Sequence, residues 1–304
     1  MINPQAFSPP DDGAGRAPTL AGLFRETVSA FHEKGIDTPE LGARLLICAA
    51  CELTHEQFAA RPEQLVRHGS RNKVAQFVAR RLSGEPVSRI LGRREFLGLD
   101  FAVTSATLDP RPDTETLVET VIALGREMIA EGRSPRILDL GTGSGCILVS
   151  VLNNLNNAWG TGLDIDPAAV GVARANAARH GLGARASFAC SSWLDAVSGQ
   201  FDILVTNPPY IPGAEIEGLA SEVADYDPRR ALDGGVDGLD AYRAIAAALT
   251  VVLKPGGWAV FEIGVDQGDA VEQILRQEAS AKAAASTRRW HDLSGKERCI
   301  GICV

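Results

Sequence analysis

The amino-terminal part of the chain is predicted to be helical, because its apolar residues recur three and four positions apart. Between residues 19 and 84 they fall in three runs: Leu20, Leu23, Phe24, Val28 and Phe31; Leu41, Leu45 and Leu46; and Val74, Phe77, Val78 and Leu82. Residues 19–86 are therefore expected to form a small helical domain. Residues 1–18 contain several prolines, aspartates and glycines and are expected to be a disordered lead.

A β-hairpin is predicted over residues 87–108, where polar positions alternate with Phe96, Leu99, Phe101 and Val103. It would link the helical domain to a second domain, residues 109–304. From Thr114 onward, segments of helical and of strand character alternate, which is typical of a doubly wound α/β fold.

Seven strands are expected in this second domain, with helices between the first five and before the sixth. Their approximate ranges are 135–140, 160–165, 185–190, 201–206, 258–263, 287–291 and 298–304. The last two surround Ser294-Gly295 and leave no room for a crossover helix, so they should be antiparallel.

Length and composition agree with a two-domain globular protein. A chain of 304 residues with 45% hydrophobic content can bury a large core. It lacks the ~18–20 uninterrupted apolar residues of a membrane span, and its start, Met1-Ile2-Asn3-Pro4, is not that of a signal peptide. We therefore expect a cytoplasmic protein with no membrane association, and we take it to be a monomer.

The six cysteines do not have the spacing of a metal site. Cys48 and Cys51 form a C-x-x-C, but they lie in an apolar helical run without a second pair for zinc. Cys299 and Cys303 fall on one face of the last predicted strand. Buried free thiols are expected for all six, and no structural metal.

The motif Asn207-Pro208-Pro209-Tyr210 directly follows the predicted strand at residues 201–206. The carboxyl end of a strand lies at the rim of the sheet, where α/β proteins bind ligands. Prolines lack an N–H and fix φ, so the carbonyls around them can face a ligand. An asparagine oxygen and a proline carbonyl suit the two hydrogens of an NH₂ group, and the tyrosine ring offers a stacking face. The motif therefore indicates chemistry on a planar amino or amide nitrogen, with a plain strand-to-loop turn as the alternative.

A glycine-rich turn, Gly141-Thr142-Gly143-Ser144-Gly145, follows the first predicted strand. Glycines at alternate positions let the backbone turn sharply and let a nucleotide cofactor approach. Asp164 ends the next strand, at the distance where an acidic side chain binds a ribose diol. A solvated or capping carboxylate is the alternative for Asp164.

Together these motifs resemble the S-adenosylmethionine-dependent amino-group methyltransferases. Other stretches narrow the resemblance to the HemK/PrmC family, which methylates a glutamine side chain in class I peptide chain release factors. These stretches are 85–92, 95–99, 110–115, 231–240, 262–264 and 292–295 with Arg298. The similarity covers roughly two-thirds of the chain, from about Glu85 to the end.

The resemblance implies a mostly parallel seven-stranded sheet with one reversed strand at its end, and roles for particular residues. The cofactor would be S-adenosylmethionine, leaving as S-adenosylhomocysteine. The glycine loop, residues 141–145, would bind its amino-acid end, Asp164 its ribose and Trp193 its adenine. Asn207 and the Pro208 carbonyl would accept the two N–H groups of the substrate amide, Pro209 would wall the slot, and Tyr210 would pack on the amide plane. Ser192 stands where the family has an acidic residue beside the adenine.

The charge of the chain indicates which class of macromolecule it binds. The net charge of -8 disfavours direct nucleic-acid binding, which rewards clustered Lys and Arg. Residues 61–94 nevertheless carry nine basic residues against two acidic ones, which is either a solvated helix face or a docking surface for an acidic protein. Three alternative functions remain: glutamine methylation of a ribosomal protein, adenine-amino methylation of DNA or RNA, and cofactor binding without catalysis.

Overall fold

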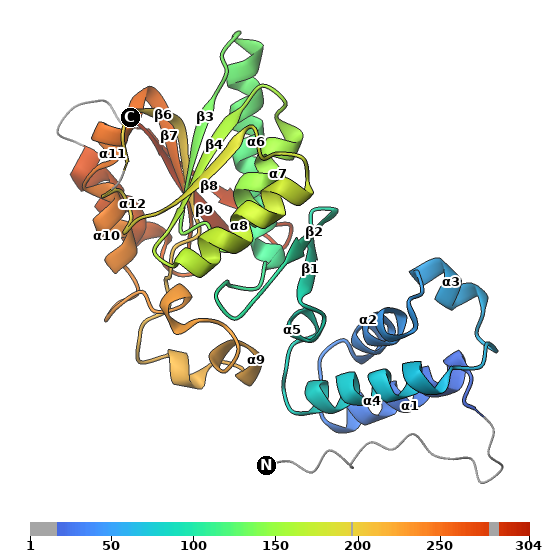
Figure 1. The fold of residues 1–304 in the computed structure, drawn as a ribbon. Coiled ribbons are helices and arrows are strands. Elements are labelled where there is room, and N and C mark those ends of the chain that lie inside the picture. The colour runs from blue at the N-terminus through green and yellow to red at the C-terminus, as the bar shows by residue number, and fades with distance from the viewer. Residues whose placement is uncertain (1–16, 196, 280–285) are drawn as a thin grey trace. The chain divides into compact units, whose positions relative to one another are not determined.

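The computed structural model describes residues 17–195, 197–279 and 286–304 and divides into two compact units, Met1–Gly92 and Arg93–Val304 (Figure 1). The expected disordered lead lies almost wholly outside the described residues. Pro18, its last residue, accepts a backbone hydrogen bond from Val66 at 2.9 Å.

The first unit is helical, as the spacing of its apolar residues predicts. Its helices are α1 (Leu20–Glu33), α2 (Pro39–Cys51), α3 (His55–Ala60), α4 (His68–Leu82) and α5 (Val87–Leu91). Leu23, Phe31, Leu46, Val74 and Val78 are fully buried between them.

Two details of this unit do not follow from the spacing alone. Leu41 is 44% exposed, because the buried face of α2 runs through Gly42, Leu46 and Ala50, one position out of phase with it. The basic residues are not all on a solvated face, since Arg81 is only 4% exposed, whereas Arg80 is exposed and paired with Glu85.

The hairpin is shorter than predicted. It consists of β1 (Arg93–Phe96) and β2 (Leu99–Ala102), joined by Leu97 and Gly98, both at positive φ. Two successive residues at positive φ make the type of turn whose twist matches that of the strands. The preceding residues, Val87–Leu91, form the helix α5 instead of a strand, with Gly92 in the left-handed region after it. A left-handed glycine is a common helix stop, so α5 ends before the hairpin begins.

The second unit also contains a seven-stranded sheet, which confirms the predicted α/β class. Its strands are β3 (Arg136–Leu140), β4 (Trp159–Asp164), β5 (Ala186–Cys190), β6 (Phe201–Thr206), β7 (Leu253–Glu262), β8 (Ser286–His291) and β9 (Glu297–Cys303). They lie in the order β5-β4-β3-β6-β7-β9-β8. β9 runs opposite to the other six strands and is antiparallel to both of its neighbours, β7 and β8.

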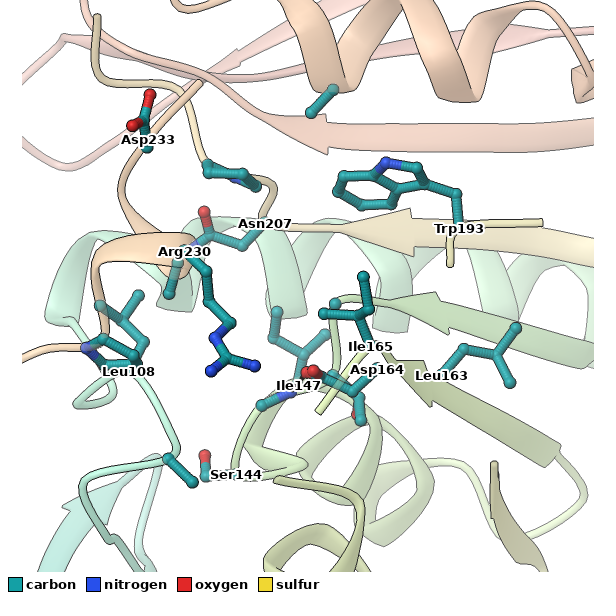
Figure 2. A pocket seen from close by; sticks show the side chains of 18 of the residues that line it. Leu108, Ser144, Ile147, Leu163, Asp164, Ile165, Trp193, Asn207, Arg230 and Asp233 are labelled. Atoms are coloured by element: carbon teal, nitrogen blue, oxygen red, sulfur yellow. Dashed lines mark hydrogen bonds between the residues drawn. The ribbon is translucent and has the colours of Figure 1, made fainter. Parts of the chain in front are cut away.

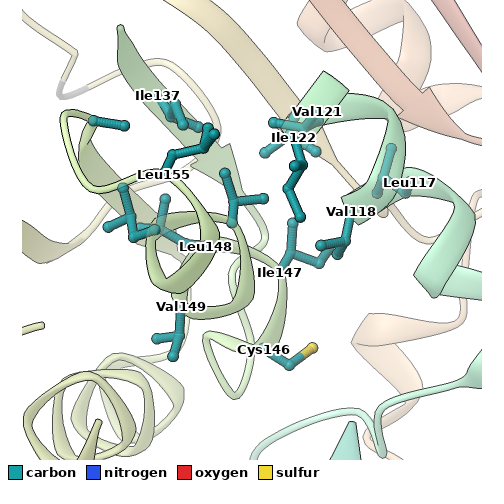
Figure 3. Packing of buried hydrophobic residues seen from close by; sticks show 14 of the residues in the cluster. Leu117, Val118, Val121, Ile122, Ile137, Cys146, Ile147, Leu148, Val149 and Leu155 are labelled. Atoms are coloured by element: carbon teal, nitrogen blue, oxygen red, sulfur yellow. The ribbon is translucent and has the colours of Figure 1, made fainter. Parts of the chain in front are cut away.

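Helices cover both faces of this sheet (Figure 1). One face carries α6 (Glu115–Ala130), α7 (Cys146–Asn154) and α8 (Pro167–Arg179), and the other carries α10 (Asp240–Ala246), α11 (Leu249–Val252) and α12 (Gly268–Ala279). Figure 3 shows Val118 and Ile122 of α6 meeting Ile147 of α7 in the first of these two cores. The remaining short helices are η1 (Pro112–Thr114), η2 (Ile216–Gly218), α9 (Ser221–Ala224) and η3 (Arg229–Ala231).

No helix forms among the described residues between β5 and β6, contrary to expectation. The connection from β5 to β6 must cross β4 and β3, a distance of about 14 Å across the sheet at ~4.8 Å per strand. It must also return along the strand direction by about 17 Å, so its two ends lie about 22 Å apart. Ten residues of helix would span only about 15 Å, whereas ten extended residues reach about 33 Å. Residues 191–195 and 197–200 therefore cross as irregular chain.

The reversed strand lies inside the sheet rather than at its end. β8 runs parallel to β7 but one position away, and β9 returns between them. The burial of each strand explains this order: Cys299, Ile300 and Ile302 of β9 are fully buried, whereas β8 has no fully buried residue and suits the edge.

All six cysteines are free, but they are not all buried. Cys190 is exposed because it ends the edge strand β5, and Cys51 and Cys303 are half-buried. Within the described residues, the helices are all too short or too polar to cross a membrane.

A buried carboxylate ties the sheet together at the opposite end from the carboxyl ends of β3 and β6. Asp202 of β6 is 2% exposed and accepts hydrogen bonds from Arg133 Nη2 at 2.8 Å, the Arg136 amide at 2.9 Å and Lys254 Nζ at 2.8 Å. Burial alone would raise the pKa of Asp202, but the hydrogen bonds from Lys254, the Arg136 amide and Arg133 outweigh burial and hold the pKa below its usual value.

Replacing Asp202 by Asn is expected to lower the free energy of unfolding at pH 7 by about 1–3 kcal/mol, because it removes charge-assisted hydrogen bonds. A lowered folded-state pKa contributes stability that is complete above the unfolded pKa of about 3.9 and is lost as the pH falls through the folded value. Urea unfolding should therefore show a difference between the two proteins that shrinks below about pH 4. The exposed control Asp266→Asn should stay within about 0.5 kcal/mol of the parent, and equal midpoints for all three proteins at pH 7 would contradict the assignment.

Candidate active site

A single cavity of about 610 Å³ brings most of the predicted site residues together at the carboxyl ends of β3, β4 and β6 (Figure 2). This volume lies in the range of small-molecule sites. The cavity belongs entirely to the second unit. Eight of the predicted residues line it: Gly141, Thr142, Gly143, Ser144, Asp164, Trp193, Asn207 and Pro209. Gly145, Pro208 and Tyr210 are not among the described residues that line it.

The glycine loop after β3 forms one wall of the cavity. Gly141 and Gly143 have positive φ, at 68° and 54°, which only glycine adopts without strain. Thr142 anchors the loop, because its amide donates to Leu163 O at 2.9 Å and its hydroxyl donates to Asp139 Oδ2 at 2.6 Å. Gly145 has another role: a Cβ there would lie 3.1 Å from Ala173 Cβ, so this glycine lets α7 begin close against α8.

Asp164 is held in the cavity by backbone donors. Its Oδ2 accepts from the Gly143 amide and its Oδ1 from the Asp166 amide, each at 2.9 Å. Each carboxylate oxygen can accept a further hydrogen bond, so the side chain is oriented and still able to bind hydroxyl groups. Arg230, which sequence patterns do not single out, also lines the cavity and pairs with Asp166 at 3.3 Å.

Trp193 lies on the irregular connection after β5, where Figure 2 shows its indole at the cavity. Its φ is 44°, an uncommon value for a bulky residue. Ser191 is 8% exposed and donates from its hydroxyl to Trp193 O at 3.2 Å, and its amide donates to Asp164 O. The strained backbone is thus fixed by the residue two positions before it. Ser192, which precedes Trp193, also lines the cavity.

Asn207 leaves β6 at the rim with a defined amide orientation. Its Nδ2 donates to Thr114 Oγ1 at 3.1 Å, so the other branch of the amide carries the acceptor oxygen Oδ1. The preceding Thr206 hydroxyl donates to Leu140 O at 2.8 Å and fixes the end of β6 to β3. Pro208 is buried behind Asn207, and Tyr210 packs against the core under α10 and α12.

The segment Gly234–Gly238 covers the backbone of the Pro-Pro-Tyr turn. A Cβ at Gly234 would lie 2.8 Å from Pro209 O, and one at Gly238 would collide with Tyr210 O. Tyr210 O also accepts from Gln267 Nε2 at 2.9 Å. The shape of the turn therefore depends on two distant glycines and a glutamine, whose contacts cannot be recognised from their own sequence positions.

Two fully buried carboxyl groups lie at this rim and were not predicted as site residues. Burial is the main cause that raises the pKa of Asp139 and of Glu262 to about 7 each. Asp139 Oδ1 and Glu262 Oε2 have no hydrogen-bond partner within the described part of the chain. A signal was available for Glu262, because it ends an apolar strand at the same edge of the sheet as Asn207, and buried acids cluster at functional sites.

Two known families match the chain. The family described as "PrmC N-terminal domain" matches residues 23–92, and the family described as "Methyltransferase small domain" matches residues 114–226. The first match covers the helical unit, and the second runs from Thr114 past the Asn-Pro-Pro-Tyr motif.

The chain is also similar to named proteins over most of its length. The release factor glutamine methyltransferase of Bradyrhizobium diazoefficiens is 45% identical over 277 residues, which are 91% of this chain and 92% of that protein. That of Rhodospirillum rubrum is 46% identical over 266 residues, 88% of this chain and 79% of that protein. Among solved structures, the hMettl16 catalytic domain in complex with MAT2A 3'UTR hairpin 6 has a TM-score of 0.53 at 16% identity, over 74% of this chain and 81% of that chain. This last likeness is one of fold.

Gly234→Ala is expected to lower the free energy of unfolding by about 1–3 kcal/mol, because the added methyl group overlaps the Pro209 carbonyl and Gly238. Gly183→Ala is the matched control, since a Cβ there meets nothing within 4 Å. Chemical unfolding of the two variants should separate them clearly. Equal stability of both variants would mean that the turn is not held by this contact.

Proposed function

The chain belongs to the release factor glutamine methyltransferase family, and we propose that it transfers a methyl group from S-adenosylmethionine to the side-chain nitrogen of a glutamine in a class I peptide chain release factor. Membership confirms the resemblance drawn from the sequence motifs. The observation that carries the proposal is that Asn207, the glycine loop and Asp164 line one cavity.

The residues of the cavity fit the cofactor. The turn with Gly141 and Gly143 offers backbone close to a ligand without any Cβ, and Asp164 is oriented by two amides with lone pairs left for ribose hydroxyls. Trp193 supplies an aromatic surface for an adenine. Ser144 Oγ lines the cavity and has no hydrogen-bond partner within the described chain, so a bound ligand or its water could satisfy this buried oxygen.

S-adenosylmethionine supplies an electrophilic methyl group on a sulfonium. The acceptor is a carboxamide nitrogen, which is a poor nucleophile because its lone pair is delocalised into the carbonyl. Positioning is therefore the main contribution that the protein can make, and it can supply up to ~7–11 kcal/mol. In the proposal Asn207 Oδ1 and the Pro208 carbonyl accept hydrogen bonds from the two N–H groups of the glutamine, which would turn the nitrogen towards the methyl group and stabilise positive charge developing on it. The new nitrogen–carbon bond would form as the carbon–sulfur bond breaks, with the electron pair leaving on S-adenosylhomocysteine. One of the two N–H protons would then be lost to water.

Support for these two acceptors differs in kind. The orientation of Asn207 follows from its bond to Thr114. The Pro208 ring is buried, but its carbonyl group belongs to the peptide bond with Pro209, and Pro209 lines the cavity. Pro209 would bound the slot, and Tyr210, which packs on the core beside it, would limit how the amide plane can tilt.

The helical unit is proposed to dock the release factor, with the basic residues between 61 and 94 that remain exposed as the attracting surface. The reaction would take place in the cytoplasm, where a translation factor is available, with the enzyme acting as a monomer and without direct contact to nucleic acid.

Purified protein incubated with methyl-labelled S-adenosylmethionine should transfer label to a class I release factor. Ribosomal proteins and DNA serve as competing acceptors in parallel reactions. Peptide mapping should place the label on a glutamine, and substitution of that glutamine in the release factor should abolish uptake. Label on a ribosomal protein or on DNA alone would contradict the proposed substrate.

Asn207→Ala should lower the single-turnover methyl-transfer rate by about a hundredfold or more, because it removes an acceptor aimed at developing charge. Calorimetry should show nearly unchanged S-adenosylmethionine affinity. Asp164→Ala is the matched comparison and should show the reverse, with cofactor affinity lowered by about tenfold or more through lost hydroxyl hydrogen bonds. An Asn207→Ala enzyme with the parent rate would refute the acceptor role.

A further inference from the structure

Three polar side chains from distant segments meet behind the substrate-facing side of Asn207. Asn207 follows β6, Thr114 ends η1, and Glu262 ends the neighbouring strand β7. The register pairs Thr206 with Phe261, so Asn207 and Glu262 are the next residues along adjacent parallel strands. Thr114 and Glu262 are each 2% exposed, which places both side chains out of water.

The directions of the hydrogen bonds are fixed by the chemistry of the donors. Asn207 Nδ2 donates to Thr114 Oγ1, so the Thr114 hydroxyl must send its own hydrogen elsewhere. The Glu262 carboxyl group lies beside both side chains, and the interactions with Thr114 and with Asn207 lower its pKa against the larger effect of burial. The three groups are called the relay below: Asn207 donates to Thr114, and the remaining hydroxyl hydrogen of Thr114 is available to the neighbouring Glu262 carboxyl group.

We propose that Glu262, acting through Thr114, is a positioning residue that fixes the Asn207 amide with Oδ1 towards the substrate nitrogen and, as a carboxylate, strengthens that acceptor. The inference rests on the proposed function, since it concerns the same amide nitrogen. No proton or other group is transferred along the relay during methyl transfer.

The relay acts in two ways. It excludes the flipped amide, because a rotated Asn207 would turn its oxygen towards Thr114 and its NH₂ towards the N–H groups of the substrate. It also polarises Asn207, because hydrogen bonds in series strengthen one another. An ionised Glu262 polarises the N–H bonds of the amide and thereby increases the negative charge on Oδ1. In a site away from water, that negative charge favours positive charge on the glutamine nitrogen.

The ionisation of Glu262 depends on the groups around it. Asp113 on η1 raises its pKa and Arg298 on β9 lowers it, and these two pair with each other at 2.9 Å. Four further titratable groups interact electrostatically with this carboxyl group, and burial raises the pKa of each. They are Tyr210, Tyr242 of α10, Cys299 of β9 and Cys146 of α7. With a pKa of about 7, Glu262 changes charge near neutral pH. Asp139 also has a pKa of about 7, so a pH profile of the parent enzyme alone does not identify the group.

The test uses the full-length protein, a purified class I release factor and single-turnover methyl transfer between pH 6 and 9. The parent rate should rise as Glu262 ionises through about pH 7. Glu262→Gln should lower the rate at pH 8.5 by about tenfold or more and flatten the rise, while S-adenosylmethionine affinity changes less than twofold. Glu127→Gln, the same change at an exposed position of α6, should match the parent.

Variants at Thr114 keep the inference testable if Glu262→Gln folds poorly. Thr114→Val removes the hydroxyl at nearly constant volume and should lower the rate by about tenfold, whereas Thr114→Ser keeps the hydroxyl and should restore most of it. Cofactor binding by calorimetry reports folding of each variant.

The outcomes separate this inference from the proposed function. A parent enzyme that labels no release factor refutes the function. A parent that labels the release factor, together with a Glu262→Gln or Thr114→Val enzyme that binds cofactor and retains the parent rate and pH profile, refutes the relay alone. If the methyl-transfer rate of Glu262→Gln still rises with pH, the rise belongs to another group, such as Asp139. That result also overturns the role of the Glu262 carboxylate.

Discussion

Parallel pairing of β3 with both β4 and β6 is the constraint on which the site depends. Parallel strands end at the same edge, so the loop after β3, the acid that ends β4 and the asparagine after β6 are brought to one rim by the sheet itself. Each then needs only local fixing. Thr142 ties the first loop to Leu163, Gly143 holds Asp164, and Thr206 ties the end of β6 to Leu140.

Close approach of backbone segments is the second requirement, and glycines meet it in places far from one another in the chain. Gly145 allows α7 to start against α8, and Gly234 and Gly238 allow a later loop to lie on the carbonyls of the Pro-Pro-Tyr turn. Rigid placement of a weak nucleophile demands this kind of packing, because small displacements of the acceptor groups reduce the benefit of orientation. The precision of the site therefore comes from contacts outside the cavity as much as from its walls.

Sequence patterns predict the parts of this structure that local composition determines. Except for β8, the strands are mainly apolar runs bounded by turn residues. The rim motifs directly follow or end β3, β4 and β6, so their meeting at one edge could be anticipated. The helix at Val87–Leu91 could not, because its short apolar alternation fits a strand equally well. The place of β9 between β7 and β8 depends on pairing between strands, and the helix-free crossover before β6 depends on the distance to be covered. Thr114 lies 93 residues from Asn207 in sequence, and a contact at that separation leaves no local pattern.

Asn176 of α8 joins the hairpin to the glycine loop through backbone groups alone. Its Nδ2 donates to Ala102 O at 3.0 Å and to Ser144 O at 2.8 Å, and its Oδ1 accepts from the Ala102 amide at 2.9 Å. Aspartate has the same shape but would set a carboxylate oxygen against two carbonyls, so only the amide satisfies all three partners. Because one side chain spans both segments, any ligand that orders the Ser144 backbone also damps fluctuations of β2. Thermodynamic reciprocity then requires that a partner which binds and orders β2 raises the affinity for that ligand by the same factor.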